Sequence, residues 1–287
     1  MSKRADRGYS RAWRGFTMVT FPPAIRAAMK RDWHGHEHIP REGGVILAAN
    51  HLSYVDWAAT CLFVHEAGRY PAFLIKASMF DVKVLGGFLR ACGQFPVKRG
   101  AADAALVLKD AERGLDRGEC LVFYPEGTAT RDPQQWPMVA RTGAARLALA
   151  TGVPVIPMAI WGAQVILPYG SKKPHLLPRH KVQILAGPPV DLSAFAGQPP
   201  ARDVLRDATA KIMADITGLL AQLRGGTPPA QPYDLAAVRR AARQAAAGPA
   251  AADGPAAGGP AADGQDSGTV AASGEAAQEA AAGEQPA

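Results

Sequence analysis

A histidine and an aspartate five positions apart form a pair of residues that could move a proton. The segment from Asn50 to Trp57 directly follows an apolar run at residues 45–49 and precedes a helical pattern. In a largely parallel sheet, this places His51 at the carboxyl end of a strand, where α/β proteins hold their sites. If a turn brings Asp56 to the imidazole, the carboxylate fixes the tautomer of His51 and stabilises the imidazolium. The plainer interpretation is a surface histidine followed by a helix-capping aspartate.

Three more segments accompany this pair. Residues 93–100 form a short apolar run that ends in the cations Lys98 and Arg99, residues 123–128 follow another apolar run, and residues 153–157 form a further one.

Together, in this order, the four segments resemble the sequence blocks of the glycerophospholipid acyltransferase family, whose bacterial prototype acylates 1-acylglycerol 3-phosphate. The resemblance covers about residues 33–192. It implies an O-acyltransferase that transfers a fatty acyl group from acyl-CoA or acyl-carrier-protein to the free hydroxyl of 1-acylglycerol 3-phosphate. The product would be phosphatidic acid in phospholipid biosynthesis. No cofactor is implied besides the thioester co-substrate.

The resemblance also implies roles for individual residues. His51 would be the general base and Asp56 its orienting partner. Arg99 and Lys98 would bind the phosphate of the acceptor, and a loop of the third block would also contact the acceptor. Lys76, before the second block, lies near a lysine of the family. These implied substrate-binding residues are Lys76, Lys98, Arg99, Glu126, Gly127 and Thr128.

Two positions depart from the family pattern. Ala129 stands where an arginine usually follows Gly-Thr, and the next arginine is Arg131; residues 141–143 read Arg-Thr-Gly where Lys-x-Gly is common. The phosphate clamp would then be built differently, or the acceptor would be another lysolipid. A non-catalytic lipid-binding protein is a further alternative, although simple binding requires no His51–Asp56 pair.

Composition favours partners that carry phosphate. The chain has 287 residues, and the part before Thr227 holds 29 basic and 18 acidic residues. Such a body suits anionic membranes, CoA or phosphorylated metabolites. Nucleic acid is not expected as a partner, because the basic residues are dispersed and no reading motif is present. Three cysteines without a paired spacing indicate buried thiols in a reducing compartment rather than a disulfide framework.

Short apolar runs alternate with helical patterns, which is typical of an α/β fold with a mixed, largely parallel sheet flanked by helices. The expected strands are residues 45–49, 72–76, 94–97, 120–124, 153–161 and 181–186. The expected helices are residues 57–66, 82–91, 101–117, 140–151 and 202–223.

Four regions are expected along the chain. Residues 1–33 form an amphipathic membrane-docking segment in which Pro22 and Pro23 divide two short helical pieces, and residues 34–223 form the acyltransferase domain. A linker and short basic helix follow at 224–247, and a disordered Ala/Gly/Pro-rich acidic tail at 248–287.

Basic and aromatic residues before residue 34 favour docking at an anionic bilayer surface, unless the aromatic side chains pack onto the core instead. No secretory signal is recognised. The expected location is therefore peripheral, on the cytoplasmic face of the cell membrane.

Two signals receive a plainer interpretation. Three histidines and a glutamate at residues 34–38 invite a metal site, but they match the family's connector before the first strand, so no metal is expected. Ser53 and Ser78 lack the Gly-x-Ser-x-Gly elbow of acyl-enzyme hydrolases. Direct transfer without a covalent intermediate is expected.

Overall fold

The fold is built on one seven-stranded sheet. The computed structural model describes residues 9–97, 101–171 and 173–246, with the side chains of 101–107 left out. The chain divides into two compact units after Ala242, and the sheet lies in the first. Its strand order is β1-β7-β6-β2-β5-β3-β4. The bounds are β1 Met29–His34, β2 Val45–Ala49, β3 Pro71–Lys76, β4 Phe95–Val97, β5 Cys120–Phe123, β6 Val155–Trp161 and β7 His180–Ala186.

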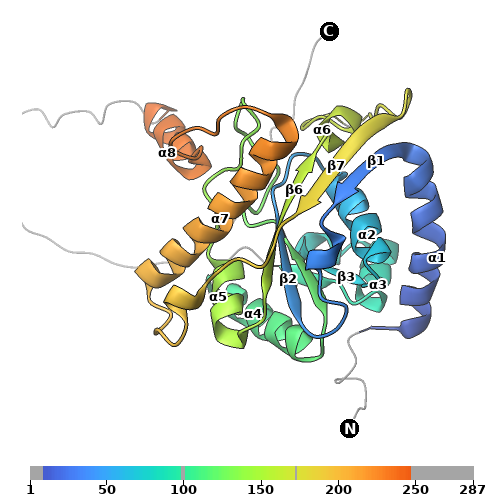
Figure 1. Cartoon of the computed structure of the whole chain (residues 1–287), viewed down its shortest axis with the longest axis horizontal. Helices are drawn as coiled ribbons and strands as arrows, with labels where there is room; N and C mark the ends of the chain where they lie inside the picture. The colour runs from blue at the N-terminus through green and yellow to red at the C-terminus, as the bar shows by residue number, and fades with distance from the viewer. Residues whose placement is uncertain (1–8, 98–100, 172, 247–287) are drawn as a thin grey trace, which may run out of the picture. The chain divides into compact units, whose positions relative to one another are not determined.

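Every strand pair is parallel except β6 with β7, which is antiparallel. The prediction of a mixed, largely parallel sheet flanked by helices is therefore confirmed (Figure 1). Because β2, β3, β4, β5 and β6 run in one direction, their carboxyl ends meet at one edge, and the loops after them can converge.

Helices cover both faces of the sheet. Their bounds are α1 Arg11–Ala28, α2 Asp56–Glu66, α3 Lys83–Ala91, α4 Ala101–Asp116, α5 Gly143–Thr151, α6 Ala163–Ile166, α7 Arg202–Arg224 and α8 Leu235–Ala246. Short 3₁₀ turns lie at His36–His38, Ala77–Met79 and Ser193–Phe195.

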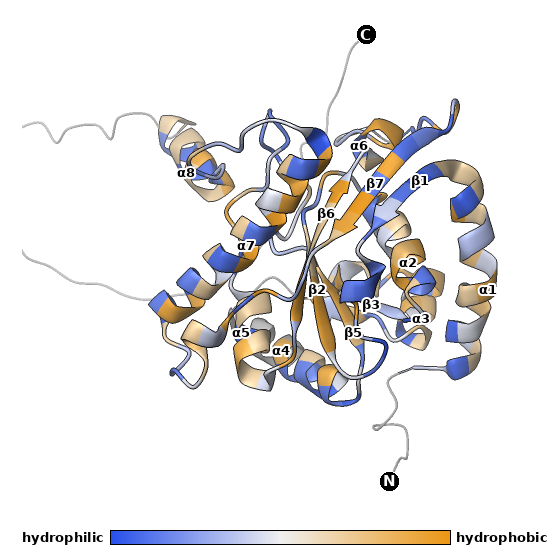
Figure 2. Ribbon diagram, viewed as in Figure 1, coloured by the Kyte–Doolittle hydropathy of each residue, from blue (hydrophilic) through white to orange (hydrophobic). Residues whose placement is uncertain are grey.

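Strand β2 shows how the two faces are divided. All five of its residues are buried, and successive side chains of a strand point to opposite faces. Val45 and Leu47 pack into the core formed with α2, whereas Ile46 and Ala48 pack into the core formed with α4, α5 and α7. A strand covered on both sides reads as a continuous apolar run, and Figure 2 shows β2, β5 and β6 in the hydrophobic colours.

The N-terminal region differs from expectation. Instead of two short pieces divided at Pro22 and Pro23, one helix, α1, runs through both prolines. Each proline costs a backbone hydrogen bond, but Pro22 and Ile25 are buried and α1 packs on α2, which holds the helix together. Residues 29–34 then form edge strand β1, because β7 offers it a parallel backbone partner.

The C-terminal part of the first unit returns to the domain after α7. The carbonyl of Tyr233 accepts the N–H of Val139 at 3.0 Å, and the guanidinium of Arg224 lies over the ring of Trp136. The expected tail at 248–287 lies outside the described residues. Within the described residues, no helix combines the length and apolar character that crossing a bilayer requires.

Candidate active site

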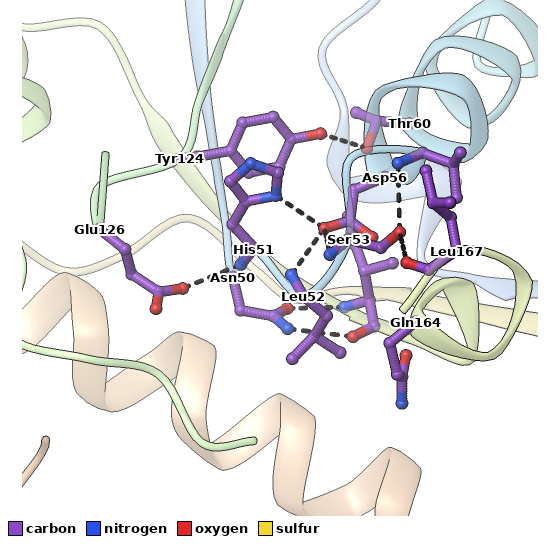
Figure 3. Close-up of polar contacts among 12 residues, drawn as sticks. Asn50, His51, Leu52, Ser53, Asp56, Thr60, Tyr124, Glu126, Gln164 and Leu167 are labelled. Atoms are coloured by element: carbon purple, nitrogen blue, oxygen red, sulfur yellow. Dashed lines mark hydrogen bonds and ion pairs between the residues drawn. The ribbon is translucent and has the colours of Figure 1, made fainter. Parts of the chain in front are cut away.

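The loop that carries the histidine leaves the sheet at a fixed point. Asn50 follows β2, is fully buried, and exchanges two hydrogen bonds with Ile160 of β6, at 3.0 and 2.7 Å (Figure 3). An amide that replaces a pair of strand hydrogen bonds extends the sheet by one residue. His51 is thereby held directly above the carboxyl edge.

His51 and Asp56 form the predicted pair. Nδ1 of His51 lies 2.8 Å from Oδ2 of Asp56, and the carboxylate stands in the first turn of α2 with no exposed surface. The same oxygen accepts the N–H groups of Leu52 at 2.6 Å and Ser53 at 2.9 Å. These bonds and the helix N-terminus stabilise a buried negative charge.

This geometry assigns the proton on the imidazole. Because Nδ1 faces a carboxylate, it carries the hydrogen, and Nε2 keeps a lone pair that can accept a proton. The side chain of His51 retains 15% of its surface exposed, so a substrate can approach it. The arrangement suits a general base whose cationic form is stabilised by the carboxylate of Asp56.

Tyr124 holds the ring in place from one side. Its ring stacks on that of His51 with centroids 4.4 Å apart and planes at 22°, and its hydroxyl lies 3.1 Å from Oγ1 of Thr60. Burial, followed by the nearby charge of Asp56, raises the pKa of Tyr124 well above its ordinary value. Tyr124 is therefore a neutral, fixed platform that limits rotation of the imidazole.

Glu126 braces the loop through backbone groups. One carboxyl oxygen accepts the N–H of His51 at 2.9 Å, and the other accepts the N–H of Met138 at 3.0 Å. Burial raises its pKa to about 8, although the two N–H bonds act in the opposite direction. The sequence suggested a substrate contact, whereas both oxygens of Glu126 here join two loops.

The neighbours of Glu126 lie at the same edge. Gly127 has φ +71°, and a Cβ there would approach Nε of Arg141 to 3.2 Å, so this position favours glycine. Thr128 is half-buried. The N–H of Thr130 donates to the carbonyl of His51 at 2.7 Å, which ties the two loops together.

Of the three cations predicted to bind substrate, one lies apart from His51 and Asp56, and the other two lie outside the described residues. Lys76 is the exposed last residue of β3, beside Val97 of β4, and β5 lies between β3 and β2. The structure therefore places Lys76 at the same edge as His51 but two strands along. Lys98 and Arg99 lie outside the described residues.

The loops after β2, β5 and β6 line an open pocket of about 340 Å³ beside the pair. Leu52 and Thr130, which flank His51 in sequence or by hydrogen bonding, belong to its wall together with Arg131 and Tyr169. Sequence reasoning did not assign Arg131, Tyr169 or Tyr124 to the site. In the sequence, Arg131 stands out only as the next arginine after Ala129, the position that departs from the family pattern.

The two plainer interpretations can be compared with the structure. Oγ of Ser53 donates to the carbonyl of Leu167 at 2.7 Å and accepts the N–H of Val55, which is a structural role. In residues 34–38, Nε2 of His34 pairs with Asp32, while His36 stacks on Phe63. Among the described residues, no three histidine, cysteine or acidic side chains are grouped as metal ligands would be.

With the fold and the pair in place, the similarity to known proteins can be stated. Residues 30–161 match the model of the Acyltransferase family. This part of the chain is therefore similar to acyltransferase domains. The resemblance to the glycerophospholipid acyltransferases, first recognised in four sequence segments, is confirmed.

Particular relatives are similar to this chain. The chloroplastic 1-acyl-sn-glycerol-3-phosphate acyltransferase BAT2 of Brassica napus is 31% identical over 145 residues, which is 50% of this chain and 40% of the relative. The 1-acyl-sn-glycerol-3-phosphate acyltransferase of Bacillus subtilis is 26% identical over 166 residues, or 58% and 76% of the two chains.

The chain spans about two fifths of the length of the plant relatives that it matches. The crystal structure of the 1-acyl-sn-glycerophosphate acyltransferase PlsC from Thermotoga maritima matches with a TM-score of 0.58 and 20% identity. That match covers 75% of this chain and 83% of the other, and it shows a shared fold.

Proposed function

We propose that the protein is an O-acyltransferase that acts on 1-acylglycerol 3-phosphate and produces phosphatidic acid for phospholipid biosynthesis. The donor is an acyl thioester, either acyl-CoA or acyl-carrier-protein. The observation that carries this proposal is the 2.8 Å contact between His51 and Asp56 at the carboxyl edge of an acyltransferase domain. The relatives named above, whose names state this acceptor, support it.

The proposed reaction is a direct transfer. Nε2 of His51 removes the proton of the acceptor hydroxyl as its oxygen attacks the carbonyl carbon of the thioester. The carbon–sulfur bond then breaks, and the leaving thiolate takes the proton from the imidazolium. Asp56 stabilises the imidazolium between these events, and a positioned base of this kind contributes about 10²- to 10⁴-fold.

The remaining predicted contacts belong to this proposal. Lys98 and Arg99 bind the acceptor phosphate, and Lys76 adds positive charge at the same edge. Gly127 and Thr128 line the approach to His51. The structural role of Glu126 supports the reaction indirectly, because its bond to the N–H of His51 fixes the base.

Peripheral membrane binding is the second part of the proposal. Trp13, Phe16 and Val19 on α1 are 47%, 53% and 73% exposed, and Val84 on α3 is 86% exposed. The rings of Trp13 and Phe88 lie 5.9 Å apart, so α1 and α3 share one apolar surface. An acyl chain gains about 0.8 kcal/mol per buried CH₂, so the acceptor stays in lipid unless the enzyme reaches it there.

Fewer basic side chains of the N-terminal region are available to contact lipid than the sequence suggested. Arg14 forms an ion pair with Glu119, and both Arg26 and Arg31 pair with Glu66. Five basic residues lie between positions 9 and 33, and these three are engaged within the protein. The other two, Arg11 and Lys30, are exposed. We therefore assign docking mainly to the apolar surface, at the cytoplasmic face of the membrane.

The activity is tested with a panel of acceptors and donors. The purified full chain is incubated with 1-acylglycerol 3-phosphate or other lysolipids, together with acyl-CoA or acyl-carrier-protein, and products are measured by mass spectrometry. Formation of phosphatidic acid supports the proposal. Absence of any acylated product with every pair, from folded protein, would overturn it.

Docking is tested by co-sedimentation with anionic liposomes. Deleting α1 and β1 would remove a strand of the sheet, so point variants are sharper. Phe16→Ser with Val84→Ser should reduce sedimentation, whereas Val238→Ser, which changes an exposed valine of α8, should not. Equal sedimentation of all three proteins would remove this surface from the proposal.

A further inference from the structure

The wall of the pocket beside the pair contains several polar side chains that have no part in the proposed reaction. Besides Leu52 and Thr130, its wall includes Arg131, Asp132, Gln135, Gln164 and Tyr169. Its volume of about 340 Å³ corresponds to on the order of ten water molecules of the liquid. This space exceeds what a lone phosphate group fills.

Arg131 is oriented by stacking on an aromatic ring, which leaves its inner nitrogen Nε available to a ligand. The guanidinium carbon lies 3.4 Å from the centroid of Tyr169, so the flat group stacks on the ring. Nε of Arg131 is buried and has no hydrogen-bond partner among the described residues. A buried donor of this kind calls for a ligand or water.

A row of aromatic rings connects Arg131 to the catalytic base. The ring of His51 lies 6.4 Å from that of Tyr54, and Tyr54 lies 5.6 Å from Tyr169. The segment that carries Tyr169 is also tied to the catalytic loop, because Ser53 donates to the carbonyl of Leu167. A head group on Arg131 therefore belongs to the same substrate that presents its hydroxyl to His51.

The loop behind Arg131 is preorganised. Both carboxyl oxygens of Asp132 accept backbone N–H groups, from Gln134 at 3.2 Å and Trp136 at 2.9 Å. Thr130 donates to the carbonyl of Trp136 at 2.8 Å. Gln135 has φ +62°, a positive value that is uncommon for a residue with a side chain. Such strain persists where the surroundings impose it, and it gathers at ligand sites.

Charge identifies the form of phosphate that fits. Among the described residues of the wall, Arg131 is a cation and Asp132 an anion, so their formal charges cancel. A phosphate monoester carries about −1.5 to −2 at pH 7 and would meet the carboxylate unfavourably. A phosphate diester carries a single negative charge, so it can pair with the guanidinium of Arg131 and is repelled less by the carboxylate of Asp132.

The amides beyond Arg131 identify the group attached to the far side of the phosphate. The oxygen of Gln164 accepts the N–H of Gly162 at 2.9 Å, and its nitrogen lies 3.4 Å from the oxygen of Gln135. The amide nitrogen of Gln135 then remains to donate, and the carboxylate of Asp132 has lone pairs left to accept. Hydroxyl groups, which both donate and accept, match this wall.

We propose that this pocket is a head-group subsite for lysophospholipids whose phosphate is a diester of a small hydroxyl-bearing alcohol. In these acceptors Arg131 takes the phosphate that Lys98 and Arg99 bind in 1-acylglycerol 3-phosphate, so the subsite widens the acceptor range. The inference rests on the proposed function, since the transfer step is the same: the acceptor hydroxyl gains the acyl group and the thiol is released with the proton.

Binding is tested first, without catalysis. Glycerophosphoglycerol, the head group without an acyl chain, is titrated into the full chain by calorimetry, with glycerol 3-phosphate as the comparison. Arg131→Gln should weaken glycerophosphoglycerol binding by about 10- to 100-fold, the value of one hydrogen bond to a charged group. Arg113→Gln, which changes an exposed arginine of α4, serves as the matched control and should bind normally.

A second variant guards against misfolding. Gln135→Gly removes the amide while suiting the positive φ, so its thermal stability should equal or exceed that of the wild type. Its preference for lysophosphatidylglycerol over 1-acylglycerol 3-phosphate, measured as a ratio of kcat/KM, should fall about tenfold.

The outcomes separate the inference from the proposed function. Acylation of lysophosphatidylglycerol by the wild type, lost preferentially in both variants, supports the subsite. Turnover of 1-acylglycerol 3-phosphate alone would overturn the subsite and leave the proposed function standing. Head-group binding without turnover of any acceptor would contradict the proposed function but not the subsite. Equal binding by Arg131→Gln and the wild type would overturn the subsite.

Discussion

Two segments of this chain each combine histidine with an acidic residue, and the fold places their histidines in different surroundings. In residues 34–38, the ring of His36 stacks on Phe63 with centroids 4.0 Å apart, and its Nε2 is buried without a hydrogen-bond partner among the described residues. In residues 50–56, the ring of His51 pairs with Asp56 and stays partly exposed. His36 therefore packs against an apolar ring, whereas His51 is oriented to accept a proton.

The difference comes from what lies behind each ring. The helix α2 contributes to both sites, because Phe63 lies in its interior and Asp56 in its first turn. An apolar ring beside an imidazole disfavours its charged form, and burial lowers the pKa of His36. A carboxylate beside an imidazole favours the charged form and orients it. The side chain that contacts each imidazole therefore determines whether the histidine packs in the core or can act as a base.

The largest expected effect separates the two histidines by activity. His51→Ala should lower turnover by about 10²- to 10⁴-fold, because the base is lost and little packing is removed. His36→Ala should keep its turnover, because the ring lies away from the proposed reaction. Steady-state assays of both variants beside the wild type measure the contrast. Equal losses in both would mean that the comparison is wrong.

A smaller effect is expected at the partner of His51. In Asp56→Asn, the amide oxygen can still accept from Nδ1, but the imidazolium loses its counter-charge, so turnover should fall by about 10- to 100-fold. The new amide NH₂ would occupy the position of Oδ1, which is buried without a partner among the described residues, at a cost of about 1 to 3 kcal/mol. Turnover and denaturant unfolding are measured together. Unchanged turnover would contradict the role of Asp56.

Glu126 should make stability depend on pH. Folding raises the pKa of Glu126 from 4.5 to about 8, so the folded protein holds a proton that the unfolded chain releases. Its contribution is present below the unfolded value and is lost as pH rises through 8. The free energy of unfolding should therefore decline across this window in the wild type, and less in Glu126→Gln. The exposed Glu37→Gln is the control, and identical slopes in all three would refute the assignment.

The smallest effect concerns the packed histidine. Burial lowers the pKa of His36 below its ordinary 6.5, so the unfolded chain takes up a proton more readily than the folded protein. Stability should fall as pH drops through this range, and His36→Ala should lose about 1 to 3 kcal/mol while showing a weaker pH dependence. Urea midpoints between acidic and neutral pH measure it. A steeper dependence in the variant would contradict the packing role.

Local sequence was sufficient where pattern and packing agree. The strand at 45–49 was predicted at its observed bounds because both of its faces are buried, which gives a continuous apolar run. The pairing of His51 with Asp56 also followed from the sequence, since it depends on one turn between a strand and a helix.

Other features depend on distant partners. The strand β1 was missed because residues 29–34 become a strand only against the edge of β7. The loop-bracing contacts of Glu126 join His51 and Met138, which are 75 and 12 positions away along the chain. The stacking of Arg131 on Tyr169 likewise requires the loops after β5 and β6 to meet. No local pattern encodes such contacts.

The most direct test of the account isolates the chemical step. Wild-type protein and His51→Ala, each in excess over 1-acylglycerol 3-phosphate and saturated with acyl thioester, are compared through a single turnover, with acceptor binding measured separately. The account predicts unchanged binding and a transfer rate lower by about 10²-fold or more in the variant. Transfer by folded His51→Ala at the wild-type rate would contradict the claim that His51 is the base.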